Sequence, residues 1–244
     1  QVNEAQAELA GHAEVVATAQ RIELERQKAK MQDGGNAEAR EELDDLVEQG
    51  FVAAVRARQL PVDVLLAEVS YAQVMAKTVA SSLREQVIGP ALARGYSEIW
   101  LGGISLGAFN ALHYAAVHAV DLAGLHLLAP YPGTDDILRE IEAAGGPAAW
   151  AALPDRSDAD ERLWWHWLWR ESTRGRQAKP LYLGLGSDDR FIRGQRQLAS
   201  LVPAGNIDEI AGDHSWPVWR ALWQRWLDRG WLANCGWQAE GGRA

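Results

Sequence analysis

The stretch E-I-W-L-G-G-I-S-L-G-A-F-N-A-L, from Glu98 to Leu112, decides the fold of this 244-residue chain. A short apolar run ends in glycines and a helix-like run follows, so the stretch predicts a strand, a tight turn and a helix. Ser105 lies in the turn, with Gly103 and Gly107 two residues to either side. Such a turn lifts the hydroxyl clear of the sheet, and the glycines let strand and helix approach. The pattern favours a nucleophilic serine over a turn that merely needs small residues.

Ser105 also stands where the predicted helix begins. The first N–H groups of a helix have no acceptor within it, and the positive end of the helix dipole lies there. The N–H of Leu106 is therefore placed to face a negative charge that develops on a reacting oxygen.

Strand-like and helix-like segments alternate on both sides of this stretch. The strand-like segments are mostly continuous apolar runs, at residues 61–69, 98–104, 122–130, 180–186 and 206–211. Such strands, separated by helices, predict an α/β fold with a mainly parallel sheet and helices on both faces. Ligands of these sheets bind at the carboxyl ends of the strands, so the residues just after each strand are the informative ones.

The chain divides into three predicted parts. Residues 1–36 are polar, alanine-rich and charged, and they read as a helical N-terminal segment. Residues 37–130 and 179–235 supply the strands and helices of the core. Residues 131–178 form a helical cap insertion, which includes the tryptophan-rich run R-L-W-W-H-W-L-W-R-E-S.

Two polar turns after later strands supply partners for Ser105. Asp188 and Asp189 follow the strand at 180–186, where one carboxylate can cap the next helix while the other orients a histidine. We choose Asp189 as the residue that orients the histidine. His214 lies in the polar turn G-D-H-S-W before the last helix, and we choose it as the general base. The resulting order along the chain is serine, acid, histidine.

This constellation resembles the α/β-hydrolase superfamily. The resemblance is carried by G-I-S-L-G as nucleophile elbow, L-G-L-G-S-D-D-R-F as acid loop and A-G-D-H-S-W as histidine loop, and it covers roughly residues 40–232. It implies that Ser105 forms an acyl-enzyme, that His214 is base and then acid, and that Asp189 orients the imidazole. Leu106 would give one oxyanion-hole N–H. The resemblance implies no metal and no organic cofactor.

The front of the chain departs from the family pattern. The family carries about three strands before the helix that we place near residues 38–59, and this sequence shows no convincing apolar strand there. We therefore expect missing early strands and an unpaired sheet edge next to the active site. Gly34 and Gly35 stand roughly where the second oxyanion donor belongs, and we take Gly35 as the candidate. The alternative is a simple helix-breaking turn.

Two tryptophans are candidates for substrate contact. Trp165 belongs to the tryptophan-rich run, whose residues either pack a cap helix onto the body or form an apolar wall over the serine. An exposed interfacial patch is a third reading of that run. Trp216 is two residues from His214, which places it near the predicted pocket.

Composition narrows the range of functions. A formal net charge of −9 supplies no basic field for nucleic acid, and no apolar run approaches the ~20 residues of a membrane span. The single cysteine, Cys235, excludes an internal disulfide and a cysteine-based zinc site, and it fits a reducing compartment. With no visible signal peptide, we expect a cytoplasmic protein whose partner is a small acyl substrate.

The first hypothesis is a serine hydrolase that cleaves a carboxylic ester or thioester of a small to medium, mainly apolar substrate. The second is a catalytically impaired member of the same fold that serves as a binding or assembly module, motivated by the altered N-terminal region. A third keeps the fold but has acyltransferase or peptidase chemistry.

Overall fold

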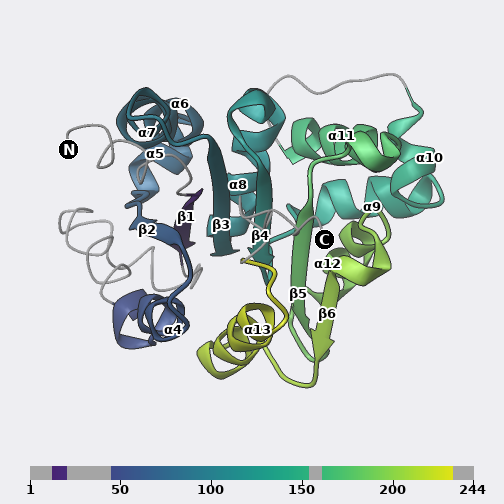
Figure 1. Cartoon of the computed structure of the whole chain (residues 1–244). Coiled ribbons are helices and arrows are strands. Elements are labelled where there is room, and N and C mark those ends of the chain that lie inside the picture. The colour runs from purple at the N-terminus through teal and green to yellow at the C-terminus, as the bar shows by residue number, and fades with distance from the viewer. Residues whose placement is uncertain (1–12, 21–44, 154–160, 233–244) are drawn as a thin grey trace, which may run out of the picture.

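The computed structural model describes residues 13–20, 45–153 and 161–232. Six strands form one sheet (Figure 1), in which neighbours are parallel and the order is β2-β1-β3-β4-β5-β6. The strands are β1 (Ala13–Gln20), β2 (Val62–Leu66), β3 (Glu98–Ser105), β4 (Gly124–Leu128), β5 (Leu181–Gly186) and β6 (Ile207–Ile210). The predicted α/β class and parallel sheet are confirmed.

Helices cover both faces of the sheet, and an apolar cluster fills the space under each layer. One layer holds α4 (Phe51–Ala57) and α13 (Trp216–Asp228). The opposite layer is larger and contains α5 (Tyr71–Met75), α6 (Val79–Leu83), η1 (Arg84–Ile88), α7 (Gly89–Ala93), α8 (Leu106–His118) and α12 (Ile192–Ala199). Short turns η2 (Ala119–Asp121), η3 (Gly175–Gln177) and η4 (Ala204–Asn206) connect elements. Burial from both sides explains the apolar strands: every residue of β4 is buried.

The prediction for the N-terminal segment is wrong where the structure describes it. We predicted helix across residues 1–36, but Ala13–Gln20 is a strand in the interior of the sheet. Its alanines favour helix by local propensity, whereas its valines and threonine are β-branched and suit a strand. Pairing with β2 on one side and β3 on the other decides for the strand, because both rows of backbone groups gain partners. The rest of the segment lies outside the described residues.

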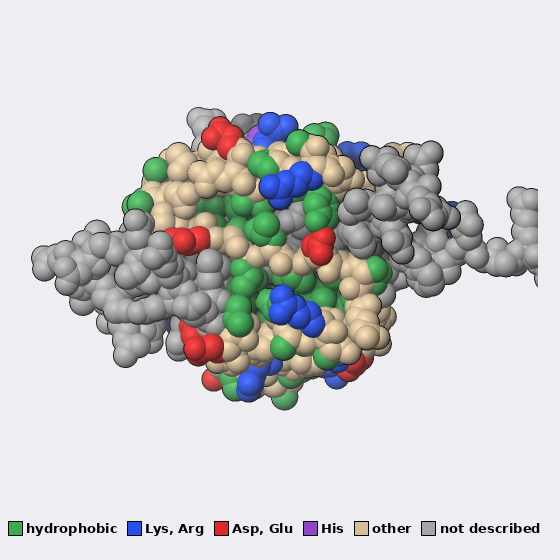
Figure 2. All heavy atoms as spheres, turned by 60° about the vertical axis from the view of Figure 1, so that its left-hand side comes forward, with side chains coloured by type: hydrophobic (Ala, Val, Ile, Leu, Met, Phe, Trp, Pro, Cys, Tyr) green, Lys and Arg blue, Asp and Glu red, His purple; other side chains and the backbone are tan. Residues whose placement is uncertain are grey.

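β1 also corrects the expected edge of the sheet. We expected an unpaired edge beside the strand of Ser105, but β1 pairs with β3 along its length, from Ala13 with Glu98 to Gln20 with Ser105. Among the described strands the edge is β2, one strand further out. Figure 2 turns this side of the molecule forward and shows hydrophobic side chains gathered in hollows between scattered charges.

Three helices lie between β4 and β5, in the part of the chain where we place the insertion: α9 (Asp135–Ala143), α10 (Pro147–Ala151) and α11 (Glu161–Ser172). α11 packs against α8, where the rings of Trp164 and Phe109 meet edge to face at 6.0 Å. These helices therefore rest on the same face of the sheet as the helix that follows Ser105.

Candidate active site

Ser105 occupies a strained turn at the carboxyl end of β3. Its φ of 53° and ψ of −113° lie in a region that residues with a Cβ rarely adopt. Gly103 makes the turn possible, because a Cβ there would lie 2.3 Å from the carbonyl carbon of Gly107. α8 begins at Leu106, so the N–H groups of its first turn, which have no acceptor within the helix itself, start beside the serine. The local geometry is that of a nucleophile elbow.

Asp189 lies in the loop after β5 and is 1% exposed. One carboxylate oxygen accepts a hydrogen bond from the backbone N–H of Phe191 at 2.8 Å, which holds the side chain at the start of the turn. The other oxygen, Oδ2, points to the histidine loop. The neighbouring Asp188 instead ties the two loops together, since its carboxylate accepts from the N–H of Gly212 at 3.3 Å and its own N–H donates to the Gly212 carbonyl at 2.9 Å.

His214 joins the two loops to the elbow. Its Nδ1 lies 2.7 Å from Asp189 Oδ2, and its Nε2 lies 2.9 Å from Ser105 Oγ. A carboxylate only accepts hydrogen bonds, so an ionised Asp189 selects the tautomer with the proton on Nδ1. Nε2 then accepts from the serine hydroxyl. The structure thus brings together the three residues that the sequence selected, although 109 positions separate the serine from the histidine.

Two aromatic rings hold the imidazole edge-on. Phe191 contacts His214 at 5.2 Å between ring centroids, and Trp219 contacts it at 5.0 Å, both nearly perpendicular. Sequence reasoning missed these positions. Trp219 carried a core-packing signal at helical spacing, and Phe191 is a single aromatic residue beside the chosen acid, so neither pointed to the site.

A hollow of about 670 Å³ opens beside these residues, between the insertion and the acid loop. Phe191 lines it, and so does Tyr131, whose N–H donates to the Ser105 carbonyl at 3.0 Å. The remaining lining residues are Pro132, Gly133, Thr134, Asp135, Leu138, Arg139, Arg190, Arg193 and Gly194. Carboxylates balance part of its positive charge: Arg139 pairs with Asp135 and Asp136, and Arg193 pairs with Glu142.

The other predicted site residues fall in different places. Trp165 is 1% exposed, stacks on Trp164 and donates its Nε1–H to the Pro132 carbonyl at 3.0 Å. It therefore packs in the core and does not line the hollow, which corrects its assignment as a substrate contact. Trp216 is half-buried beside the histidine loop and packs edge-on against Phe51 and Trp219. Gly35 lies outside the described residues.

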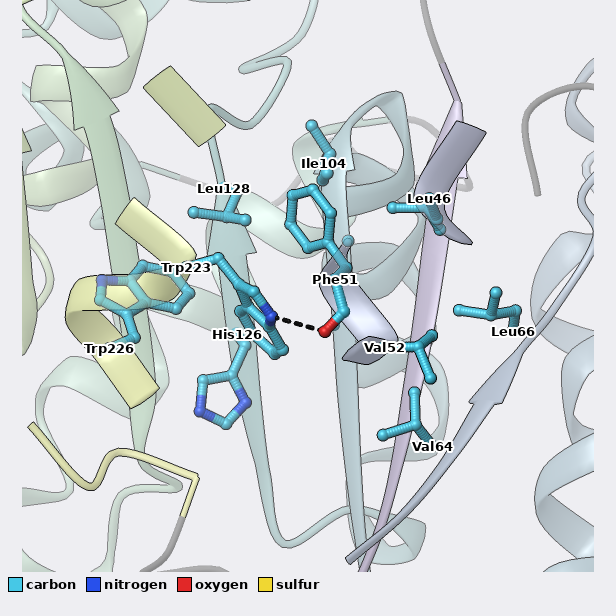
Figure 3. A pocket seen from close by; sticks show the side chains of 12 residues that line it. Leu46, Phe51, Val52, Val64, Leu66, Ile104, His126, Leu128, Trp223 and Trp226 are labelled. Atoms are coloured by element: carbon cyan, nitrogen blue, oxygen red, sulfur yellow. Dashed lines mark hydrogen bonds between the residues drawn. The ribbon is translucent and has the colours of Figure 1, made fainter. Parts of the chain in front are cut away.

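A second, apolar cavity lies on the opposite face, between the sheet and helices α4 and α13 (Figure 3). It offers about 30 Å³, room for one or two water molecules. Trp223 and Phe51 both line it, and Trp223 donates its Nε1–H to the Phe51 carbonyl at 3.1 Å. His126 borders it, and burial lowers the pKa of this histidine to about 3. The imidazole stacks on Tyr182 and packs at a tilt against Trp100, so it is a core residue.

Among residues 13–20, 45–153 and 161–232, no cluster of three or more histidine, cysteine or acidic side chains could hold a metal ion. No helix in that part of the chain is long and apolar enough to cross a membrane.

Comparison with known proteins finds similarity in structure only. No model of a protein family matches the sequence, and no curated protein sequence matches it. S-formylglutathione hydrolase from Staphylococcus aureus superposes with a TM-score of 0.57 at 12% identity, covering 93% of this chain and 84% of that one. S-formylglutathione hydrolase from Agrobacterium tumefaciens gives 0.51 at 13% identity, with 95% and 87% covered.

A fluorophosphonate-binding serine hydrolase from Staphylococcus aureus gives a TM-score of 0.50 at 11% identity, with 92% of this chain and 84% of that one covered. Likeness at this level of identity concerns the fold. The strand order, the elbow and these superpositions agree: the chain has the α/β-hydrolase fold.

Proposed function

We propose that this protein is a serine hydrolase that cleaves a carboxylic ester or thioester of a small to medium, mainly apolar substrate. The observation that carries the proposal is the chain of contacts from Asp189 through His214 to Ser105, at 2.7 and 2.9 Å, with the serine in a strained elbow.

In the first half-reaction, Ser105 Oγ attacks the acyl carbonyl carbon while His214 Nε2 takes the hydroxyl proton. The carbonyl oxygen becomes an oxyanion, which the N–H of Leu106 at the start of α8 stabilises. The carbon–oxygen or carbon–sulfur bond then breaks, and the leaving alcohol or thiol receives the proton from Nε2. Asp189 keeps the imidazole in the productive tautomer and stabilises its charged form.

In the second half-reaction, water attacks the acyl-enzyme and gives its proton to His214 Nε2. The ester bond to Ser105 breaks, the serine recovers that proton, and the carboxylic acid leaves. A second oxyanion donor completes the site, and Gly35 stays our candidate for it.

The hollow beside Phe191 and Tyr131 supports the proposed substrate class. The two aromatic rings contact each other edge-on at 5.3 Å and form a wall next to the triad. Such a wall favours an apolar or aromatic group in the part of the substrate that does not react. Trp216 is our candidate contact on the other side of the histidine loop.

A fluorophosphonate probe and a short p-nitrophenyl ester test the proposal together. We expect the wild-type protein to be labelled and to hydrolyse p-nitrophenyl butyrate, and Ser105→Ala to lose both. Labelling that survives the substitution would remove Ser105 from the role. A folded wild-type protein without labelling or hydrolysis would favour the binding module. Turnover that rises in proportion to an added alcohol acceptor, with ester as product, would favour an acyltransferase.

A further inference from the structure

Gln195 is a buried polar residue in contact with the proposed triad. It lies on α12, is 0% exposed, and was not selected by any sequence pattern. Its Nε2 donates to Asp189 Oδ2 at 3.1 Å and to the carbonyl oxygen of Pro130 at 3.1 Å. Both partners are acceptors, and only the nitrogen end of an amide donates, so the hydrogen bonds themselves fix the orientation of the amide.

The Pro130 carbonyl belongs to a short segment, residues 129–131, whose backbone also hydrogen-bonds to Ser105. Ala129, just after β4, has a φ of 45°, which a residue with a Cβ rarely adopts. Its N–H donates to the Gly184 carbonyl at 2.8 Å, and the N–H of Tyr131 donates to the Ser105 carbonyl at 3.0 Å. The backbone of residues 129–131 therefore touches the elbow on one side and Gln195 on the other.

We infer that Gln195 is a positioning residue: it links the carboxylate of Asp189 to residues 129–131, whose backbone hydrogen-bonds to Ser105. The inference rests on the proposed function for its catalytic consequence. Two N–H bonds from one buried amide set the distance between the acid loop and the end of β4. One of them also shares the negative charge on Asp189 Oδ2, the same oxygen that receives His214. Hydrogen bonds to a charged oxygen favour the ionised carboxylate. The contact with Gln195 therefore weakens the attraction of Asp189 Oδ2 for the proton on His214 Nδ1.

Gln195→Met tests the inference, because methionine keeps the length of the side chain and removes both N–H donors. The matched control is Gln197→Met on the same helix, since Gln197 donates to Glu142 rather than to the triad. We expect kcat to fall about ten- to one-hundred-fold in Gln195→Met with little change in KM, as for the loss of a hydrogen bond to a charged group. The control should keep the wild-type kcat. Equal kcat in both variants would overturn the inference.

Two further measurements separate positioning from a general loss of folding. The first is Gln195→Glu, where a protonated carboxyl can still donate to Asp189 but an ionised one repels it. The activity of this variant relative to wild type should fall as the pH rises, and a ratio that does not change with pH would contradict the role.

The second is the NMR signal of the Nδ1–H proton of His214, which needs no turnover. In Gln195→Met this signal should move downfield from its wild-type position, because Asp189 Oδ2 has lost a competing donor and accepts more strongly from the Nδ1–H. An unchanged signal would sink the inference even where the enzyme is active. A shifted signal in a protein that hydrolyses no ester would keep the positioning contact and reject the proposed function.

Discussion

Gln20, the last residue of β1, is paired in register with Ser105, the last residue of β3. This pairing places an interior strand beside the elbow, where we had expected the sheet to end. The two strands finish at the same level, so the carboxyl edge of the sheet continues past the serine on its β1 side. The main reason to expect an impaired site, a bare edge next to the nucleophile, is therefore absent.

The two neighbouring aspartates should differ sharply in their effect on catalysis. Asp189→Asn leaves an amide against Nδ1 of His214, which favours the wrong imidazole tautomer, and we expect kcat to fall by about 10³–10⁴. Asp188→Asn weakens contacts outside the triad, to the N–H of Gly212 and the hydroxyl of Ser187, and its loss in kcat should be about tenfold or less. Steady-state hydrolysis of p-nitrophenyl butyrate measures both. A larger loss in Asp188→Asn would reverse our assignment of the acid.

Gly103 should tolerate no side chain. In Gly103→Ala the new Cβ would meet the backbone of Gly107 and Ala108 at 2.3–2.4 Å, so β3 and α8 must move apart. We expect a loss of about 3 kcal/mol or more in the free energy of unfolding, together with loss of fluorophosphonate labelling. Gly205→Ala is the matched control, because nothing lies within 4 Å of the position of its Cβ. Urea denaturation compares the two, and equal stabilities would contradict the packing at the elbow.

His126 should make the fold sensitive to acid. Burial lowers the pKa of His126 to about 3, whereas an unfolded histidine titrates near about 6.5. Between these values the unfolded chain binds a proton that the folded protein does not, so stability falls as the pH is lowered through this window. The slope from this residue is at most about 1.4 kcal/mol per pH unit.

His126→Phe keeps an aromatic ring packed against Trp100 and Tyr182 and removes the titrating group. The variant should lose less stability than wild type as the pH is lowered from about 6.5 to about 4. At about pH 7.5 the slopes of the free energy of unfolding with pH should be most alike in the two proteins. Chemical denaturation at several pH values measures this. Parallel stability curves would show that the buried imidazole is not the source of the acid sensitivity.

Phe191 should matter for both the base and the substrate. Its ring contacts His214 at 5.2 Å and lines the hollow, so Phe191→Ala removes a support of the imidazole and part of the proposed apolar wall. We expect kcat to fall about tenfold or more and KM for an aromatic ester to rise. Phe191→Leu, which restores bulk without the ring, should recover most of kcat. If the alanine variant matches wild type in both constants, the hollow is not the substrate site.

The sequence alone determined the parts of this protein that depend on neighbouring residues. A strained turn needs glycine near Ser105, and aspartate and histidine stand in polar turns after later strands, where they can serve a nucleophile. G-I-S-L-G, S-D-D-R-F and G-D-H-S-W therefore indicated the fold and all three triad candidates. The alternation of apolar strands with helices predicted the parallel sheet for the same reason: each strand shows by its own composition that it is buried on both faces.

The tertiary structure decided what depends on partners far apart in the chain. A-E-V-V-A-T-A-Q is ambiguous by propensity, and it becomes β1 only because β2 and β3 supply backbone partners on both sides. Trp165 was a candidate substrate contact by sequence, but in the folded protein it donates its N–H to the Pro132 carbonyl and packs in the core. Gln195 gains its role from Pro130, and Phe191 gains its role from His214, and only folding brings these partners to them. Consecutive residues determine the chemistry of a turn. A contact across the sheet depends on two segments that are far apart in the chain, and neither segment alone determines the distance between them.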